Sequence, residues 1–218
     1  MHHFNKNDIQ SFSKIYRLNL INSITGYKSA NLIGTRSNSG EENVAIFSSI
    51  THLGSNPALL HFTLRPNTVP RDTYKNIKEN KVFTVNHVSL RQIEQAHHTS
   101  AKYDENISEF DQTQLESDYR LDWQAPFVKG SPICLGCRYL NEYLIKENGC
   151  VLIIASIEHI FVKDQLLQKD GWVKLESGEV DLEKSVELYE KGVKLKKIFE
   201  EKLKKEELQI KKIKIEEN

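Results

Sequence analysis

Hydroxyl and guanidinium side chains gather where two apolar stretches in the first half of the chain end. Ser48 and Ser49 follow the run NVAIF, and Arg65 follows the run ALLHFTL. Arg71 and Thr73 come shortly afterwards, across a segment that contains two prolines. Hydroxyl donors and guanidinium groups that converge on one point are typical of a phosphate site. The pattern therefore raises three alternatives: a catalytic serine, ordinary turn residues, or an anion site.

The local sequence separates these alternatives only in part. A nucleophilic serine of the G-x-S-x-G type needs flanking glycines, and the sequence around Ser48 is I-F-S-S-I. The turn interpretation stays open because hydroxyl residues are common where a strand meets a loop. The anion site is favoured by Arg65, whose fork can bond two phosphate oxygens, and by Thr73 at the start of an expected helix. Adjacent strand residues face opposite sides, so only one of Ser48 and Ser49 can face a given ligand unless a bulge lies there.

Cys134 and Cys137 form a C-x-x-C motif, which is found in zinc sites and redox pairs. A structural zinc needs two more ligands, and the later candidates, Cys150 and His159, lack ligand spacing. The motif lies in a strand-like run, where residues three apart face opposite sides. We therefore expect two small buried side chains and no metal site. The pair His97–His98 is expected to end a helix, where it would interact favourably with the helix dipole.

The amino-acid composition limits the classes of protein to which this chain can belong. The chain has 218 residues, which suits one domain, and a hydrophobic fraction of 39%, which is enough for a core. Lys+Arg and Asp+Glu both number 30, so the net charge is zero and there is no overall field for nucleic acid or an anionic membrane. No apolar run approaches the roughly 18 residues of a membrane span, and the polar start MHHFNKNDIQ is unlike a signal segment. With an odd number of cysteines, these features predict a cytoplasmic protein with reduced thiols and no nucleic-acid or membrane partner.

The hydrophobic periodicity predicts short strands with helices at the periphery. Strands are expected at ANLIGT, NVAIFSSI, ALLHFTL, VFTVNHV, SPICLGCRYL and CVLIIASIEHIFV. Helices are expected over residues 8–18, from an Asp72 or Thr73 cap, from Ser89 to Tyr103, and as a long amphipathic helix from Asp181. Residues 103–131 are expected to be irregular, with aromatic anchors at Phe110, Trp123 and Phe127. Short strands with few helices between them indicate a small β-barrel, and the missing G-x-G-x-x-G motif argues against a Rossmann fold.

A series of short motifs in this region resembles one known family. In order they are NLIGT, then a glycine turn and AIFSS, then HLGSNP, RDTYKNI and FTVNHV, followed later by QAHHTSA and SEF. Together they resemble the flavin reductase-like family of FMN-binding split-barrel proteins. The resemblance covers residues 20–130 well and residues 130–165 more loosely.

The resemblance implies a fold and a function. The fold is mainly β with peripheral helices, a split β-barrel of the FMN-binding type over residues 1–180, followed by an amphipathic helix and charged tail over 181–218. The protein would be a homodimer with FMN held non-covalently near the interface. The expected function is that of an oxidoreductase, an NAD(P)H-dependent flavin reductase that uses NADH or NADPH and serves a partner oxygenase or another electron acceptor. The alternatives are a non-enzymatic FMN electron carrier, and a barrel module that binds haem or no ligand.

The resemblance also assigns cofactor-binding residues. The isoalloxazine ring would lie along the backbone of Gly34, Thr35, Asn43, Val44 and Ala45. The ribityl phosphate would meet Ser48, Ser49, Arg65 and Thr73, with Arg71 as the next candidate and Asn76 one helical turn beyond Thr73. No catalytic side chain is expected, because the cofactor itself carries the hydride chemistry.

Overall fold

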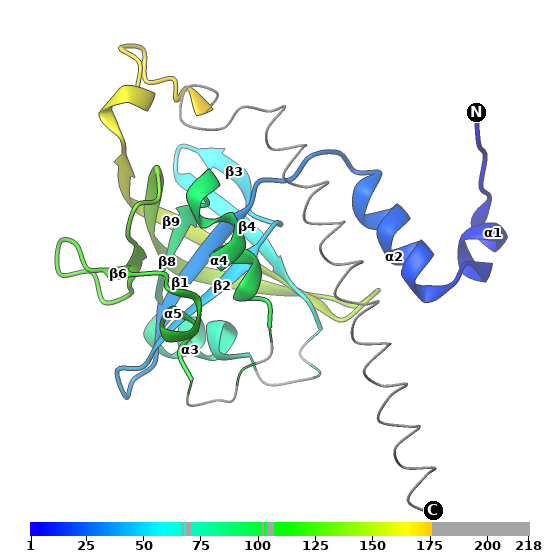
Figure 1. The fold of residues 1–218 in the computed structure, drawn as a ribbon, viewed down its shortest axis with the longest axis horizontal. Helices are drawn as coiled ribbons and strands as arrows, with labels where there is room; N and C mark the ends of the chain where they lie inside the picture. The colour runs from blue at the N-terminus through cyan, green and yellow to red at the C-terminus, as the bar shows by residue number, and fades with distance from the viewer. Residues whose placement is uncertain (67, 69–70, 102, 104–106, 176–218) are drawn as a thin grey trace, which may run out of the picture.

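The computed structural model describes residues 1–66, 68, 71–101, 103 and 107–175. One antiparallel sheet has its seven strands in the order β2-β1-β5-β8-β9-β4-β3 (Figure 1). These strands are β1 (Asn31–Arg36), β2 (Glu42–Phe47), β3 (Thr51–Ser55), β4 (Ala58–Leu64), β5 (Val82–His87), β8 (Ile133–Ile145) and β9 (Cys150–Val162). A short separate ribbon pairs β6 (Ser117–Asp118) with β7 (Phe127–Val128). The predicted mainly β fold class is confirmed, whereas the predicted segment 181–218 lies outside the described residues.

Short helices surround this sheet. They are α1 (Lys6–Ser11), α2 (Lys14–Ser23), α3 (Asp72–Asn80), α4 (Ile93–His98) and α5 (Glu109–Thr113), with 3₁₀ turns η1 (Leu90–Gln92) and η2 (Asp164–Leu166). The helix predicted over 8–18 is wrong in extent, because Ser13 caps a second helix by accepting a hydrogen bond from Tyr16 N at 3.3 Å. The predicted start at Ser89 is confirmed by a capping box with Gln92, although the helical residues end at His98. None of the described helices is long and apolar enough to cross a membrane.

The sheet curls so that strands far apart in its order meet. The main core cluster takes side chains from β1, β4, β5, β8 and β9 and from Ile77 of α3. The ring of Phe47, at the end of β2, lies 5.5 Å from the ring of Phe62 in β4, in an edge-to-face arrangement. Since β2 and β4 are separated by four strands in the sheet order, this contact closes the apolar interior without closing the hydrogen-bonded ladder.

Ser49, which follows β2, is hydrogen-bonded to β4 on the other side of the curled sheet. Its hydroxyl donates to Thr63 O at 3.1 Å and accepts from Thr63 N at 3.2 Å. One side chain therefore satisfies both backbone groups of a β4 residue, in the way that a neighbouring strand would. Ser48, by contrast, is exposed.

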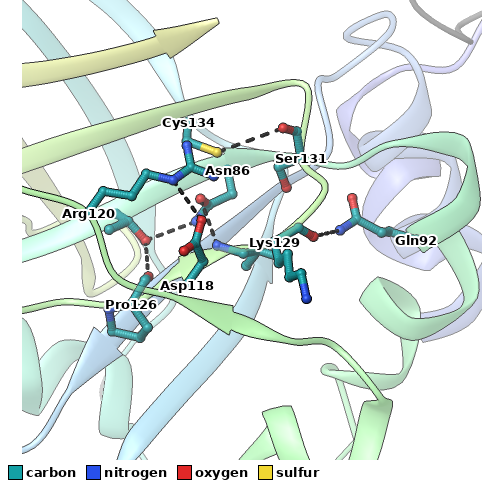
Figure 2. Close-up of polar contacts among 10 residues, drawn as sticks. Asn86, Gln92, Asp118, Arg120, Pro126, Lys129, Ser131 and Cys134 are labelled. Atoms are coloured by element: carbon teal, nitrogen blue, oxygen red, sulfur yellow. Dashed lines mark hydrogen bonds and ion pairs between the residues drawn. The ribbon is translucent and has the colours of Figure 1, made fainter. Parts of the chain in front are cut away.

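The irregular segment after α5 is fixed to the sheet by buried polar groups. Thr84 Oγ1 in β5 donates to Pro126 O at 2.6 Å, and Asn86 Oδ1 accepts from Val128 N at 3.0 Å. The amide of Asn86 also donates to Leu32 O at 3.1 Å. Figure 2 shows Asn86 and Pro126 with their contacts beside the Asp118–Arg120 ion pair. All three predicted aromatic anchors, Phe110, Trp123 and Phe127, are buried.

We predict that Ser49→Ala destabilises the fold, whereas Ser48→Ala does not. The first change leaves both backbone groups of Thr63 without their partner, which typically costs about 2 kcal/mol. The second change removes an exposed hydroxyl and should alter the free energy of unfolding by less than about 0.5 kcal/mol. Urea unfolding of both variants measures the difference. An equal effect of the two substitutions would contradict the role of Ser49 in joining the two sides of the barrel.

Candidate functional site

Two neighbouring hollows lie at the N-terminal end of α3. The smaller is a crevice without room for a water molecule in this structure, lined by Leu64, Arg65, Arg71, Tyr74 and Val151. The larger has a volume of about 470 Å³ and shares Arg71 and Tyr74 with the smaller one. Its other lining residues are mostly polar: Ser37, Ser39, Glu41, Glu42, Asn43, Asp72, Lys75, Asn76, Ile107, Ser108, Glu109 and Asp111. Among the described residues, the start of α3 is therefore where predicted site residues from β2, from just after β4 and from α3 come together.

Arg65 and Arg71 line the same hollow, as the sequence analysis expected of an anion site. Arg65 follows β4 and is exposed, while Arg71 Nε is buried without a hydrogen-bond partner among the described residues. A buried donor of this kind costs free energy unless a ligand or water accepts its hydrogen. The unpartnered donor and the second guanidinium therefore fit an anion with several acceptor oxygens.

The start of α3 adds backbone donors to this hollow. The N-cap is Arg71, and no side chain among the described residues caps the helix, so the predicted capping role of Asp72 or Thr73 is wrong. The first N–H groups of a helix without a capping side chain favour an anion. Asp72 opposes this effect with a negative charge in the first turn.

Contacts with β8 hold α3 in place. Tyr74 Oη donates to Glu142 Oε1 at 3.0 Å, and Lys78 Nζ lies 3.0 Å from the same oxygen. Lys78 Nζ also donates to Tyr139 Oη at 3.1 Å. The bonds to Tyr139 and Glu142 raise the pKa of Lys78, while burial and the Glu142 bond raise the pKa of Tyr74. The ring of Tyr74, which forms part of both hollows, is thereby fixed by its hydroxyl.

A buried polar network ties α3 to the β1–β2 hairpin. Asn43 Nδ2 lies 3.2 Å from Thr35 Oγ1 and 3.0 Å from Thr73 Oγ1. Asn76 Nδ2 donates to Thr35 Oγ1 at 3.2 Å. All four residues were predicted as site residues, and the structure brings their side chains into contact.

Glu109 of α5 completes this network, although it was not among the residues predicted for the site. Its Oε2 accepts from Val44 N at 3.3 Å, so it binds an outward N–H of the edge strand β2. Burial raises the pKa of the Glu109 carboxyl, and the charge of Asp72 adds to this effect. The only signal in the sequence was the SEF motif of the resemblance, which carries no indication of where Glu109 points.

The remaining predicted residues lie elsewhere or have other partners. A Cβ on Gly34 would lie 2.2 Å from Pro126 O, so packing against the irregular segment is a sufficient reason for glycine at this position. Val44 is fully buried in a second core cluster beneath α4 and α5, and Ala45 is half-buried. The Ser49 hydroxyl proton is directed to Thr63 O and is not available to a ligand while that bond is made.

The two cysteines of the C-x-x-C motif lie in different core clusters. Cys137 belongs to the main cluster, while Cys134 packs with Val82, Trp123, Ala125 and Phe127. Burial raises the pKa of Cys134 to about 11 and raises that of Cys137 further still. Neither thiol therefore has the thiolate character that redox chemistry needs. Among the described residues, no group of three or more His, Cys, Asp or Glu side chains is placed to hold a metal ion.

Comparison with family models places most of the chain in one group. The model of the flavin reductase-like domain matches residues 27–174. A second model, that of the exonuclease VII small subunit, matches residues 173–212, which lie almost entirely outside the described residues.

Solved structures with the same fold include close and distant relatives. A "putative flavin reductase with split barrel domain" from Shewanella frigidimarina is 40% identical, with a TM-score of 0.79 over 82% of this chain and 89% of that one. Component B of nitrilotriacetate monooxygenase from Bacillus cereus is 20% identical, with a TM-score of 0.71 over 81% and 88%. By sequence alone, the chain is also similar to an uncharacterised protein from Methanothermobacter thermautotrophicus, 26% identical over 70% of this chain and 69% of its own length. These comparisons confirm the predicted split-barrel fold.

We predict that Cys150 is alkylated quickly and that Cys134 and Cys137 are not. Cys150 is only half-buried, whereas the raised pKa of Cys134 leaves it about 100-fold less thiolate than an ordinary thiol near neutral pH. Mass spectrometry of peptides after brief iodoacetamide treatment of the native protein measures this. Alkylation in urea should label all three thiols and serves as the control. A Cys134–Cys137 disulfide in the native protein would overturn the structural interpretation of the motif.

Proposed function

The chain belongs to the flavin reductase-like family, and from this premise we propose that it binds FMN non-covalently and reduces flavin with NADH or NADPH. The single observation that carries the choice of FMN is the buried Arg71 Nε without a partner, in a hollow that Arg65 shares. FMN ends in a phosphate monoester, whose oxygens would accept from both guanidinium groups. The chemistry supplied by the cofactor is the transfer of electrons from a nicotinamide nucleotide to an acceptor.

The chain's own residues have separate parts in this proposal. Arg65, Arg71 and the first N–H groups of α3 would hold the phosphate, with Thr73 beside them. Thr35, Asn43 and Asn76 would form a polar wall, because they are already fixed to one another by hydrogen bonds. Ala45 is the half-buried member of the predicted ring contacts, so it is the one best placed to meet the isoalloxazine. Ser48 is exposed and available to a ligand, unlike Ser49.

The proposal extends to a homodimer and to a partner that consumes reduced flavin. Support for a dimer comes from large apolar side chains that are exposed in the single chain. They lie on α2 and on the β8–β9 hairpin: Ile15, Tyr16, Leu18, Ile21, Leu140, Tyr143 and Leu144. Figure 1 shows α1 and α2 standing apart from the sheet. The shared fold with component B of a monooxygenase supports delivery of reduced flavin to a separate oxygenase as the role to test.

We predict that Arg71→Ala and Arg65→Ala each weaken FMN binding but not riboflavin binding. Hydrogen bonds to a charged partner are typically worth about 1.5–3 kcal/mol, which corresponds to a loss of roughly 10- to 150-fold. Fluorescence-quench titration with both flavins measures the effect. Lys75→Ala is the matched control, because it removes a nearby positive charge that does not line the smaller hollow. Equal weakening of both flavins would assign the arginines to the fold instead of the phosphate.

We also predict that the purified protein releases mainly FMN when denatured, and that NADH or NADPH bleaches the bound flavin under anaerobic conditions. Chromatography of the released flavin and anaerobic absorbance titration measure these two properties. Released FAD would contradict the assignment to a single terminal phosphate. A yellow protein that neither nucleotide bleaches would be an electron carrier and not a reductase.

A further inference from the structure

The ring of Tyr74 lies between the two hollows at the start of α3. Tyr74 and Arg71 line both hollows, whereas each of the other lining residues belongs to one of them. The smaller hollow has no room for a water molecule, and Arg71 Nε is buried without a hydrogen-bond partner among the described residues. A ligand oxygen that bonded to this donor would remove the cost of leaving it unpaired. Such an oxygen enters the smaller hollow only if one of the lining groups moves.

The walls of the smaller hollow differ in how firmly they are held. Leu64 and Val151 lie directly opposite each other on β4 and β9, so the hydrogen-bonded ladder fixes both. Arg65 is exposed at the end of β4. The ring of Tyr74 comes from α3, and its hydroxyl lies 3.0 and 3.2 Å from the two carboxylate oxygens of Glu142 on β8. Displacement of the Tyr74 ring would therefore open the hollow, and its cost would be the bond to Glu142.

The position of α3 does not depend on the Tyr74 hydroxyl alone. Lys78, one turn further along the helix, forms an ion pair with Glu142 at 3.0 Å and donates to Tyr139 Oη at 3.1 Å. Ile77 of the same helix is fully buried in the main core cluster. These contacts would hold the helix in place when the Tyr74 ring moves aside.

We propose that the ring of Tyr74 is a gate between the larger cavity and the guanidinium groups of Arg65 and Arg71, and that Glu142 is the positioning residue that holds the gate closed. Opening the gate would join the smaller hollow to the cavity of about 470 Å³ that Tyr74 also lines. The inference rests on the proposed function, because it takes the phosphate of FMN as the anion that passes the gate. Riboflavin has no phosphate and would bind with the gate closed.

Tyr74→Phe is the test, because it removes the hydroxyl and keeps the ring. A gate predicts stronger FMN binding, since the ligand no longer has to break the bond to Glu142, whereas a fixed wall that supports the ligand predicts weaker binding. We expect FMN to bind roughly tenfold more tightly than to the wild type, the equivalent of one hydrogen bond to a charged group. Riboflavin affinity should not change. Fluorescence-quench titration measures both affinities, and unchanged or weaker FMN binding would overturn the proposal.

Tyr139→Phe is the matched control. It removes another phenol hydroxyl from the same network, the one bonded to Lys78, but Tyr139 lines neither hollow. FMN affinity of this variant should equal that of the wild type. Equal gains in Tyr74→Phe and Tyr139→Phe would assign the effect to a general loosening of α3 and would overturn the gate.

Glu142→Gln tests whether Glu142 acts through Tyr74. The neutral amide oxygen accepts a weaker hydrogen bond than the carboxylate, so FMN affinity should rise, although by less than in Tyr74→Phe. In the Tyr74→Phe background the same substitution should give no further gain, because there is no hydroxyl left to hold. A gain that persists in this background would mean that the charge of Glu142 repels the phosphate directly, and it would overturn the assignment of Glu142 as a positioning residue.

Inorganic phosphate gives a readout that does not depend on flavin. In calorimetric titrations, Tyr74→Phe should bind phosphate roughly tenfold more tightly than the wild type, and Arg71→Ala in this background should remove the gain. No gain in phosphate affinity would overturn the gate even if flavin binds. A gain in a protein that binds no flavin would reject the proposed function and leave the gate established.

Discussion

The site depends on how helix α3 is anchored over the curled sheet. Its one fully buried apolar residue, Ile77, enters the main core cluster, and polar side chains fix the helix on both flanks. On one flank Thr73 and Asn76 bond to the β1–β2 hairpin, and on the other Tyr74 and Lys78 bond to Glu142 of β8. Rotation of α3 about its axis would break one set or the other. This constraint fixes where the helix starts, and so brings Arg71 beside Arg65 from the end of β4.

The anchoring has an electrostatic cost at the same end of the helix. The larger cavity has more carboxylates than cations, and Asp72 places a negative charge in the first turn. Repulsion from these carboxylates weakens the binding of an anion there, unless the arginines lie closer to the anion than the carboxylates do. The smaller hollow meets this condition, because both arginines line it and none of its lining residues is acidic. The geometry therefore separates a cationic hollow from an acidic cavity, with Arg71 and Tyr74 at their boundary.

The limits of single strands could be predicted from the sequence, whereas contacts between distant residues at the site could not. The limits of ALLHFTL and CVLIIASIEHIFV agree with β4 and β9 residue for residue, because alternating burial and flanking turns define a strand locally. The Arg65 and Arg71 pair was also within reach, since Arg65 follows a recognisable strand and Arg71 precedes a recognisable helix. The Ser49–Thr63 bond and the contact of Glu109 with Val44 could not be predicted from the sequence. They join residues 14 and 65 positions apart. Such contacts follow from how the sheet curls, which hydrophobic periodicity does not encode.

The two edge strands of the open sheet, β3 and β2, are protected from pairing with a further strand in different ways. The protection of β2 involves residues of the candidate site. At β3 a register shift between His52 and Gly54 interrupts the ladder, which disfavours pairing with another strand. At β2 the outward N–H groups of Val44 and Ile46 are bound by side chains, Glu109 Oε2 and Thr99 Oγ1.

The carboxyl group of Glu109 therefore accepts hydrogen bonds from two parts of the structure, the edge strand and the Asn43 network. Protection of the edge requires an acceptor for Val44 N, and either a carboxylate or an amide oxygen meets that requirement. The same Oε2 also accepts from Asn43 Nδ2 at 3.2 Å in the amide orientation that satisfies the neighbours of Asn43. A substitution to alanine would remove both bonds, whereas the amide oxygen of a glutamine could accept both. Through Asn43 and Thr73, this one carboxyl oxygen connects the edge strand β2 to the first turn of α3.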